Sequence, residues 1–205
     1  MRAALVCCLL ALASVAAGPD SSASSNGSSR IVYLVRHGEA YKNLQTGSAA
    51  QDAQFDKLTE QGRQQAAATG ARLRGVGLTA VASAPEQRTR DTALAITSRA
   101  LLLPASVDPG LTSKAYDGES PDARATRGIA ALRRFLGRTR GAVAVVSHGH
   151  LITLMTAKLT GQAFTPEVLK SELVNAGVVK LRVTGLGGSG EKWEKLEADA
   201  QVRDD

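Results

Sequence analysis

The sequence feature that most constrains the fold is an apolar run that stops at a cation, an imidazole and a glycine. Residues 31–35 read IVYLV, and Arg36, His37 and Gly38 follow directly. A short run rich in β-branched residues predicts a buried strand of a parallel sheet. Since open α/β sheets bind ligands at the carboxyl ends of their strands, Arg36 and His37 are candidates for a binding site. Taken alone, the same dipeptide also fits a solvated turn.

Predicted strands and helices alternate along the rest of the chain. This alternation predicts an α/β fold, a three-layer sandwich with a mostly parallel central sheet flanked by helices. A polar loop is expected over 41–54 and irregular chain over 109–120. We expect further strands at 79–83, 105–108, 142–147, 177–183 and 192–198, helices at 59–74, 85–99, 151–159 and 165–173, and one more helix that begins at Pro121.

The first 29 residues are not expected to belong to the core. Arg2 precedes an apolar run over 3–17 that ends in small residues, which is typical of a secretory signal peptide over residues 1–17. The serine-rich residues 18–29 then form a flexible linker, and 30–205 are left as one folded domain. The predicted location is secreted or lumenal. An organelle transit peptide is the alternative, although only one basic residue precedes the apolar run.

Cysteine usage and charge exclude several function classes. Both cysteines, Cys7 and Cys8, lie inside the predicted signal peptide, so the mature chain is expected to have no disulfide and no cysteine metal site. Later apolar runs are too short to span a membrane. The net charge of +6 comes with few aromatic residues, and nothing resembles the basic and aromatic pattern of nucleic-acid binding. Six arginines between Pro121 and Arg140 predict a solvated helix face, or a field that attracts anionic substrates.

Two of the three histidines, His37 and His148, directly follow predicted strands. Parallel strands point their carboxyl ends the same way, so the two imidazoles are expected to converge. Arg88 lies in the first turn of a predicted helix, where the helix dipole disfavours a cation. A bound anion compensates such a charge, and so does a nearby carboxylate such as Asp91 or Glu86.

Two arginines and two histidines at strand-to-helix junctions make a pocket for a phosphoryl group. Arginine donates paired hydrogen bonds to phosphate oxygens, and helix N-termini add backbone donors. An imidazole in such a pocket can attack phosphorus and form a phosphohistidine. The cations can neutralise the charge that develops, so this chemistry predicts no metal and no cofactor.

Four sequence elements carry a resemblance to a known family. Residues 36–39 read RHGE, 56–66 read DKLTEQGRQQA, 83–93 read SAPEQRTRDTA, and 145–149 read VVSHG. They resemble, in the family's order, four elements of the histidine phosphatase superfamily, which are its Arg-His-Gly signature, its Leu-Thr-Glu helix start, its second-arginine helix and its second-histidine strand. The likeness extends over nearly all of the predicted domain and implies a phosphoglycerate-mutase-like fold.

The resemblance also implies roles for individual residues. His37 would be the phosphorylated nucleophile, and Arg36, Arg88 and His148 would hold the phosphoryl group. Asn43 falls where the signature ends in asparagine and would be an auxiliary contact. Arg90 lies two positions beyond Arg88, hence on another face of the helix, and the register of the motif selects Arg88.

The proton donor is the one departure from the family pattern. The family often places a glutamate in a Leu-x-Glu element after the second-arginine helix, but Ser113 stands at that position. Asp117 and Glu119 are the candidates to replace it, with Glu119 preferred. Several phosphatases of the superfamily lack this glutamate, whereas its absence counts against a phosphoglycerate mutase.

The expected function is therefore a metal-independent phosphatase that hydrolyses phosphomonoesters through a phosphohistidine on His37. A mutase that returns the phosphoryl group to a second hydroxyl is one alternative. A non-catalytic module that binds a phosphorylated ligand is another, although binding alone needs no nucleophile. Expected substrates are phosphorylated small molecules or phosphoproteins, whose specificity would lie in residues 41–54 and 109–120.

Overall fold

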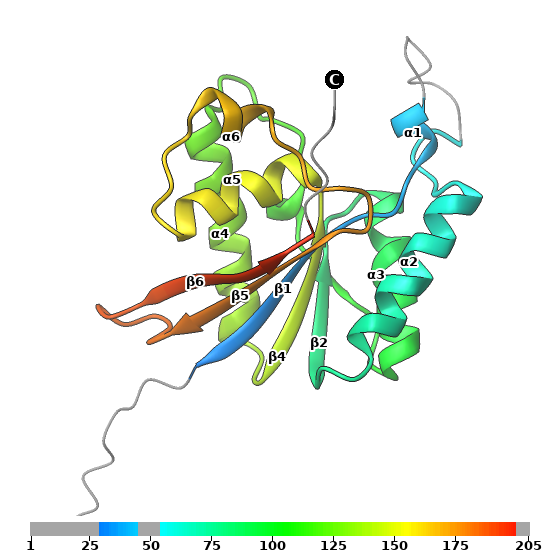
Figure 1. Ribbon diagram of the computed structural model, residues 1–205, viewed down its shortest axis with the longest axis horizontal. Coiled ribbons are helices and arrows are strands. Elements are labelled where there is room, and N and C mark those ends of the chain that lie inside the picture. The colour runs from blue at the N-terminus through cyan, green and yellow to red at the C-terminus, as the bar shows by residue number, and fades with distance from the viewer. Residues whose placement is uncertain (1–28, 45–53, 200–205) are drawn as a thin grey trace, which may run out of the picture.

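A six-stranded sheet forms the middle layer of the protein (Figure 1). The computed structural model describes residues 29–44 and 54–199. The strand order is β3-β2-β4-β1-β5-β6; β1 to β4 run parallel to one another, whereas β5 is antiparallel to both β1 and β6. The strands are β1 (Arg30–Arg36), β2 (Leu78–Ser83), β3 (Ser106–Val107), β4 (Ala142–Ser147), β5 (Val178–Thr184) and β6 (Lys192–Ala198).

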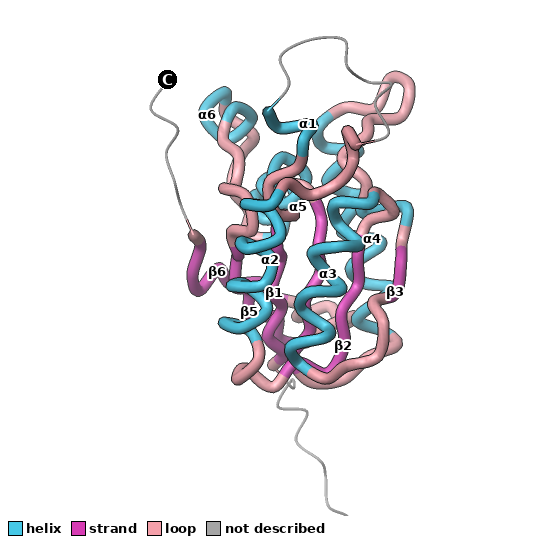
Figure 2. Tube along the Cα trace, turned by 90° about the vertical axis from the view of Figure 1, so that its right-hand side faces the viewer, coloured by secondary structure: helices cyan, strands magenta, loops and turns pink. Residues whose placement is uncertain are grey.

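Helices cover both faces of the sheet, as Figures 1 and 2 show from two sides. One face carries α2 (Glu60–Leu73) and α3 (Gln87–Ala100), and the other carries α4 (Pro121–Gly137), α5 (Gly149–Leu159) and α6 (Pro166–Lys170). A single turn, α1 (Tyr41–Leu44), follows β1, and a 3-10 turn, η1 (Pro109–Leu111), follows β3. The predicted three-layer α/β sandwich is confirmed.

The side chains of β1 alternate between two apolar cores. Val32 and Leu34 pack in the core beneath α4 and α5, whereas Tyr33 and Val35 pack in the core beneath α2 and α3. Successive side chains of a strand point to opposite faces. Because both faces are covered, the strand is apolar at nearly every position, and the first polar residues appear where it leaves the sheet.

Several predicted boundaries are shifted. The helix predicted from Pro85 begins at Gln87, because Glu86 is its N-cap and has extended backbone angles (φ −65°, ψ 144°). The helix predicted over 165–173 shortens to α6, and the loop predicted over 41–54 begins with the turn α1. The predicted signal peptide and nearly all of the linker lie outside the described residues, so those boundaries stay predictions. Among residues 29–44 and 54–199, no helix has the length and apolar character of a membrane span.

Candidate active site

The two histidines meet where β1 and β4 end side by side. Arg36 is paired with Ser147 across the strands, and the amide of His37 donates to the carbonyl of Ser147 at 3.0 Å. The rings of His37 and His148 then lie 5.3 Å apart, edge to face, and both side chains are buried. The structure thus shows the convergence that the strand pattern predicts.

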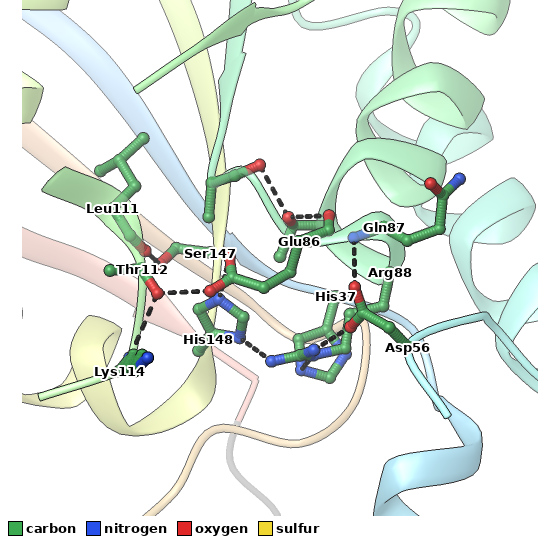
Figure 3. A network of polar contacts seen from close by, with 12 residues as sticks. His37, Asp56, Glu86, Gln87, Arg88, Leu111, Thr112, Lys114, Ser147 and His148 are labelled. Carbon is green, nitrogen blue, oxygen red and sulfur yellow. Dashed lines mark hydrogen bonds and ion pairs between the residues drawn. The ribbon is translucent and has the colours of Figure 1, made fainter. Parts of the chain in front are cut away.

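Arg88 bridges the two imidazoles from the first turn of α3 (Figure 3). Its Nε donates to Nε2 of His37 at 3.2 Å, and another guanidinium nitrogen donates to Nδ1 of His148 at 3.1 Å. Arg90 is exposed and its guanidinium binds the side chain of Gln87. The register of the motif therefore selects the arginine that reaches the histidines.

Hydrogen bonds fix the tautomer of His37. A guanidinium can only donate, so Nε2 of His37 accepts from Arg88 and carries no proton. The proton is on Nδ1, which donates to the carbonyl of Gly38 at 2.7 Å. Burial lowers the pKa of His37 well below its usual value, and the neighbouring His148 and arginines lower it further. The neutral ring therefore presents a lone pair on Nε2 next to a cation.

Arg36 is the last residue of β1 and is also buried. Its guanidinium lies 3.3 Å from the carboxylate of Glu172 and donates to the carbonyl of Leu173. These contacts tie the end of β1 to the segment that precedes β5. A second positive charge is thereby held next to His37 in sequence and beside Ser147, the neighbour of His148, in the sheet.

Glu86 is a residue of the site that the motif analysis did not assign to it. Nε2–H of His148 donates to one carboxylate oxygen of Glu86 at 3.0 Å, and the hydroxyl of Thr112 donates to the other. Burial alone raises the pKa of Glu86, but the hydrogen bonds from His148 and Thr112 outweigh it and lower the pKa to about 2. The signal available in the sequence was its position at the N-cap of the helix that carries Arg88.

Asp56 is the anion that compensates Arg88. One carboxylate oxygen accepts from the guanidinium, and the other accepts from the amide of Gln87 at 2.6 Å, at the N-terminus of α3. The sequence predicted a bound anion, Asp91 or Glu86 for this purpose. Instead Asp91 accepts from the side chain of Gln87, and Glu86 binds His148.

Two residues expected at the site have other partners. The side chain of Asn43 is exposed in α1, and its oxygen accepts from the amide of Ala40 at 2.8 Å. The carboxylate of Glu119 binds Arg127 of α4 at 2.8 Å, and this hydrogen bond is the main cause of a pKa of about 2. Glu119, the preferred proton donor from sequence, is therefore placed in an ion pair that ties its loop to α4, and Asp117 is exposed.

Two glycines explain why the first two motifs occur together. A Cβ on Gly38 would lie 2.3 Å from the carbonyl oxygen of Gly62, and a Cβ on Gly62 would lie 1.9 Å from that of Glu39. Both distances are far below van der Waals contact. The backbone after His37 therefore rests directly on the first turn of α2, and this contact fixes where the nucleophile candidate sits.

Two buried imidazoles and two buried guanidiniums thus gather at the carboxyl ends of the parallel strands of an α/β protein, the edge at which such sheets bind ligands. The family model of the histidine phosphatase superfamily, branch 1, matches residues 32–116 and 111–195. The chain belongs to that superfamily, as the four motifs predict. No curated protein matches the sequence. Within the part of the chain that the structure describes, no group of three or more histidine, cysteine, aspartate or glutamate side chains is arranged to hold a metal ion.

Solved structures share the fold at low sequence identity. A mycobacterial glucosyl-3-phosphoglycerate phosphatase complexed with VO3 superimposes with a TM-score of 0.69 at 20% identity, over 84% of this chain and 100% of the other. Bacillus stearothermophilus YhfR gives 0.65 at 22% identity, over 84% and 98% of the two chains. Phosphoserine phosphatase from Entamoeba histolytica, in complex with 3-phosphoglyceric acid, gives 0.62 at 18% identity, over 84% and 98%.

Proposed function

We propose that this protein is a metal-independent phosphatase that hydrolyses phosphomonoesters through a phosphohistidine on His37. The observation that carries the proposal is the orientation of His37. Its Nδ1–H is held by the carbonyl of Gly38, which leaves Nε2 without a proton and with its lone pair toward Nε of Arg88. Membership of the histidine phosphatase superfamily supports the same reading.

In the first step, Nε2 of His37 attacks phosphorus and the bond to the ester oxygen breaks. Arg36 and Arg88 neutralise the charge on the phosphoryl oxygens, since guanidinium groups bind such oxygens in pairs. The first amides of α5, which begins immediately after His148, add backbone donors. In the second step, water attacks the phosphohistidine, releases inorganic phosphate and restores the neutral ring.

The proposed substrates are phosphorylated small molecules. Two of the structural neighbours are a glucosyl-3-phosphoglycerate phosphatase and a phosphoserine phosphatase, which supports this class. Specificity is proposed to lie in residues 41–54 and 109–120, since α1 follows the carboxyl end of β1 and η1 follows that of β3.

The test is release of phosphate from p-nitrophenyl phosphate in the presence of EDTA. We expect turnover by the wild type and none by His37→Ala. His150→Ala is the matched control, because His150 is the third histidine and makes no hydrogen bond to the cluster; its turnover should be retained. Alkali-quenched digests after reaction with labelled substrate should contain alkali-stable, acid-labile phosphate only when His37 is present. Equal turnover by the wild type and His37→Ala would refute the mechanism.

The same assay separates the rival functions. A mutase would form an isomeric phosphate ester faster than inorganic phosphate. A binding module would retain phosphate or vanadate without turnover by any variant.

We also propose that residues 1–17 are a signal peptide and that the mature protein is secreted or lumenal. The charge before the apolar run and the small residues at its end support this. Mass spectrometry of the amino terminus of protein recovered from its natural host should find a start near residue 18. A mature protein that retains Met1 or the apolar run would contradict the proposal.

A further inference from the structure

We propose that His148 and Glu86 together form the general acid that protonates the leaving oxygen, in place of the glutamate missing at Ser113. This inference rests on the proposed phosphatase function and adds the source of the proton to it. Protonation of a leaving group contributes roughly 10²–10⁴-fold in rate, so an active enzyme of this kind needs such a group.

The first argument is the position of the Glu86 carboxylate. It extends from the N-cap of α3 to the loop after η1, where the hydroxyl of Thr112 donates to it. That hydroxyl also accepts from the amide of Lys114 at 3.2 Å, so the loop is folded around it (Figure 3). Thr112 is the neighbour of Ser113. A carboxylate from a different helix therefore reaches the loop in which the family's glutamate is expected.

The second argument is the hydrogen bonding of His148. Arg88 donates to Nδ1, and Nε2–H donates to Glu86 at 3.0 Å. In this arrangement Nδ1 lies toward Arg88, which also contacts His37, and the opposite nitrogen is held by a carboxylate. A carboxylate in that position fixes the tautomer and stabilises the imidazolium when it forms. Phosphoryl oxygens that bind in the pocket add negative charge on the Nδ1 side, which favours a proton there.

The charge state of Glu86 decides which partner carries the proton. Burial raises the pKa of Glu86, but the hydrogen bonds from His148 and Thr112 outweigh this effect and lower the pKa to about 2. The carboxyl group is therefore ionised at neutral pH and has no proton to give. For His148, burial and Arg88 lower the pKa and Glu86 only partly opposes them, so in the free enzyme Nδ1 carries no proton and accepts from Arg88. Glu86 thus acts as a positioning residue, and Nδ1 of His148 is the donor atom.

The proton and the electron pairs balance over the two steps. As the bond between Nε2 of His37 and phosphorus forms, the bond from phosphorus to the ester oxygen breaks. The proton comes from the substrate: the ester binds as its monoanion, and its phosphate proton passes to the Nδ1 lone pair of His148 as Arg88 turns from that atom to the phosphoryl oxygens. The electron pair of the broken bond stays on the ester oxygen, which takes this proton from Nδ1, and the phosphate released at the end takes up the proton that the second step returns to Nδ1. In the second step, the attacking water gives a proton back to Nδ1 and forms a bond to phosphorus. The pair of the phosphorus–nitrogen bond returns to His37.

The test compares Glu86→Gln with the wild type on two substrates of different leaving group. The amide oxygen of glutamine can still accept from His148, but it carries no charge. 2,4-Dinitrophenyl phosphate has a leaving group that needs no proton, whereas benzyl phosphate has one that does. We expect a loss of roughly 10²-fold in kcat/KM on benzyl phosphate, in the range of general acid catalysis, since kcat/KM reports cleavage of the ester and not the later hydrolysis of the phosphohistidine. On 2,4-dinitrophenyl phosphate we expect a change of less than about threefold, because no acid contribution can be lost there.

Two further variants keep the result interpretable. Asp117→Asn removes an exposed acid from the same loop and should leave both rates unchanged. Thr112→Val removes the hydroxyl that holds Glu86 but keeps the charge, so it should cause a smaller loss with the same preference for benzyl phosphate. If Glu86→Gln does not fold, Thr112→Val provides the test in its place.

An equal loss on both substrates, or no loss on either, would overturn the inference while leaving the phosphatase intact. A wild type that cleaves neither substrate would overturn the proposed function itself, and the two failures are therefore distinguishable.

Discussion

Asp56 binds Arg88 and the N-terminus of α3 at the same time, with one carboxylate oxygen on the guanidinium and the other 2.6 Å from the amide of Gln87. A guanidinium and a helix N-terminus are the donors that a phosphoryl group uses. The side chain of Asp56 is 39% exposed. We therefore predict that it competes with a phosphate for these two donors.

Asp56→Asn should strengthen the binding of inorganic phosphate. The amide oxygen still accepts from Gln87, so the helix cap is kept, but the negative charge in the pocket is removed. We expect phosphate to bind several-fold more tightly, since one charge-assisted contact is worth about 1 kcal/mol or more. Titration calorimetry with phosphate measures this. Asp91→Asn is the control on α3, and weaker binding by Asp56→Asn would show that the carboxylate supports the site instead.

Arg88→Lys should abolish most activity although the charge is kept. Three nitrogens of the guanidinium contact His37, His148 and Asp56, and a single ammonium cannot span both imidazoles. We expect kcat/KM for p-nitrophenyl phosphate to fall by about 10²-fold or more, as for the loss of a preorganised donor. Arg90→Lys, two positions along the same helix and exposed, should retain wild-type kinetics. Equal kinetics for the two variants would contradict the arrangement.

The histidines and Arg88 were predictable because local patterns determine where they lie. An apolar run fixes where a strand ends, so His37 and His148 could be placed at one sheet edge from sequence. The helical register then separates Arg88 from Arg90. The antiparallel pair of strands at the end of the sheet could also be predicted, because the glycine-rich residues 185–190 indicate a hairpin turn between two strands. The order β3-β2-β4-β1-β5-β6 was not, because periodicity does not identify a strand's neighbours.

The acids of the site could not be assigned in this way. Asp56 is 32 positions from Arg88 and Glu86 is 62 positions from His148, so their roles depend on how distant segments pack. Carboxylates are common on surfaces, and nothing in the local pattern separates Glu86 from Glu119. The family pattern directed attention to the loop after η1, whereas the structure brings a carboxylate to that loop from α3.

Gly62→Ala should destabilise the fold and displace His37. The new Cβ would lie 1.9 Å from the carbonyl of Glu39, and that atom is backbone and cannot rotate away. We expect a loss of about 2–4 kcal/mol in the free energy of unfolding, as for overpacking of a rigid contact. Chemical denaturation measures the loss. Gly75→Ala is the control, because a Cβ at Gly75 meets nothing within 4 Å and should leave the stability unchanged or slightly higher. Equal stabilities would show that the loop after His37 is free to move.

The stability of the protein should fall as the pH drops below about 6.5, the ordinary pKa of histidine. Burial lowers the pKa of all three histidines, His37, His148 and His150, in the folded state. Below pH 6.5 the unfolded chain takes up protons that the folded chain does not, so unfolding becomes more favourable as the pH falls. Each such group adds a slope of about 1.4 kcal/mol per pH unit between its two pKa values.

Urea unfolding at pH 5, 6, 7 and 8 checks this. Over that range Glu86 is ionised in both states, since its folded pKa is about 2, and it adds little to the slope. We expect stability to be nearly flat from pH 8 to 7 and to decline toward pH 5. His37→Gln removes one of the titrating rings and should make the decline shallower by about 1.4 kcal/mol per pH unit, provided the folded pKa lies below the range. A wild type whose stability rises between pH 7 and 5 would mean that the histidines gain protons on folding, and the neutral Nε2 nucleophile would then be wrong.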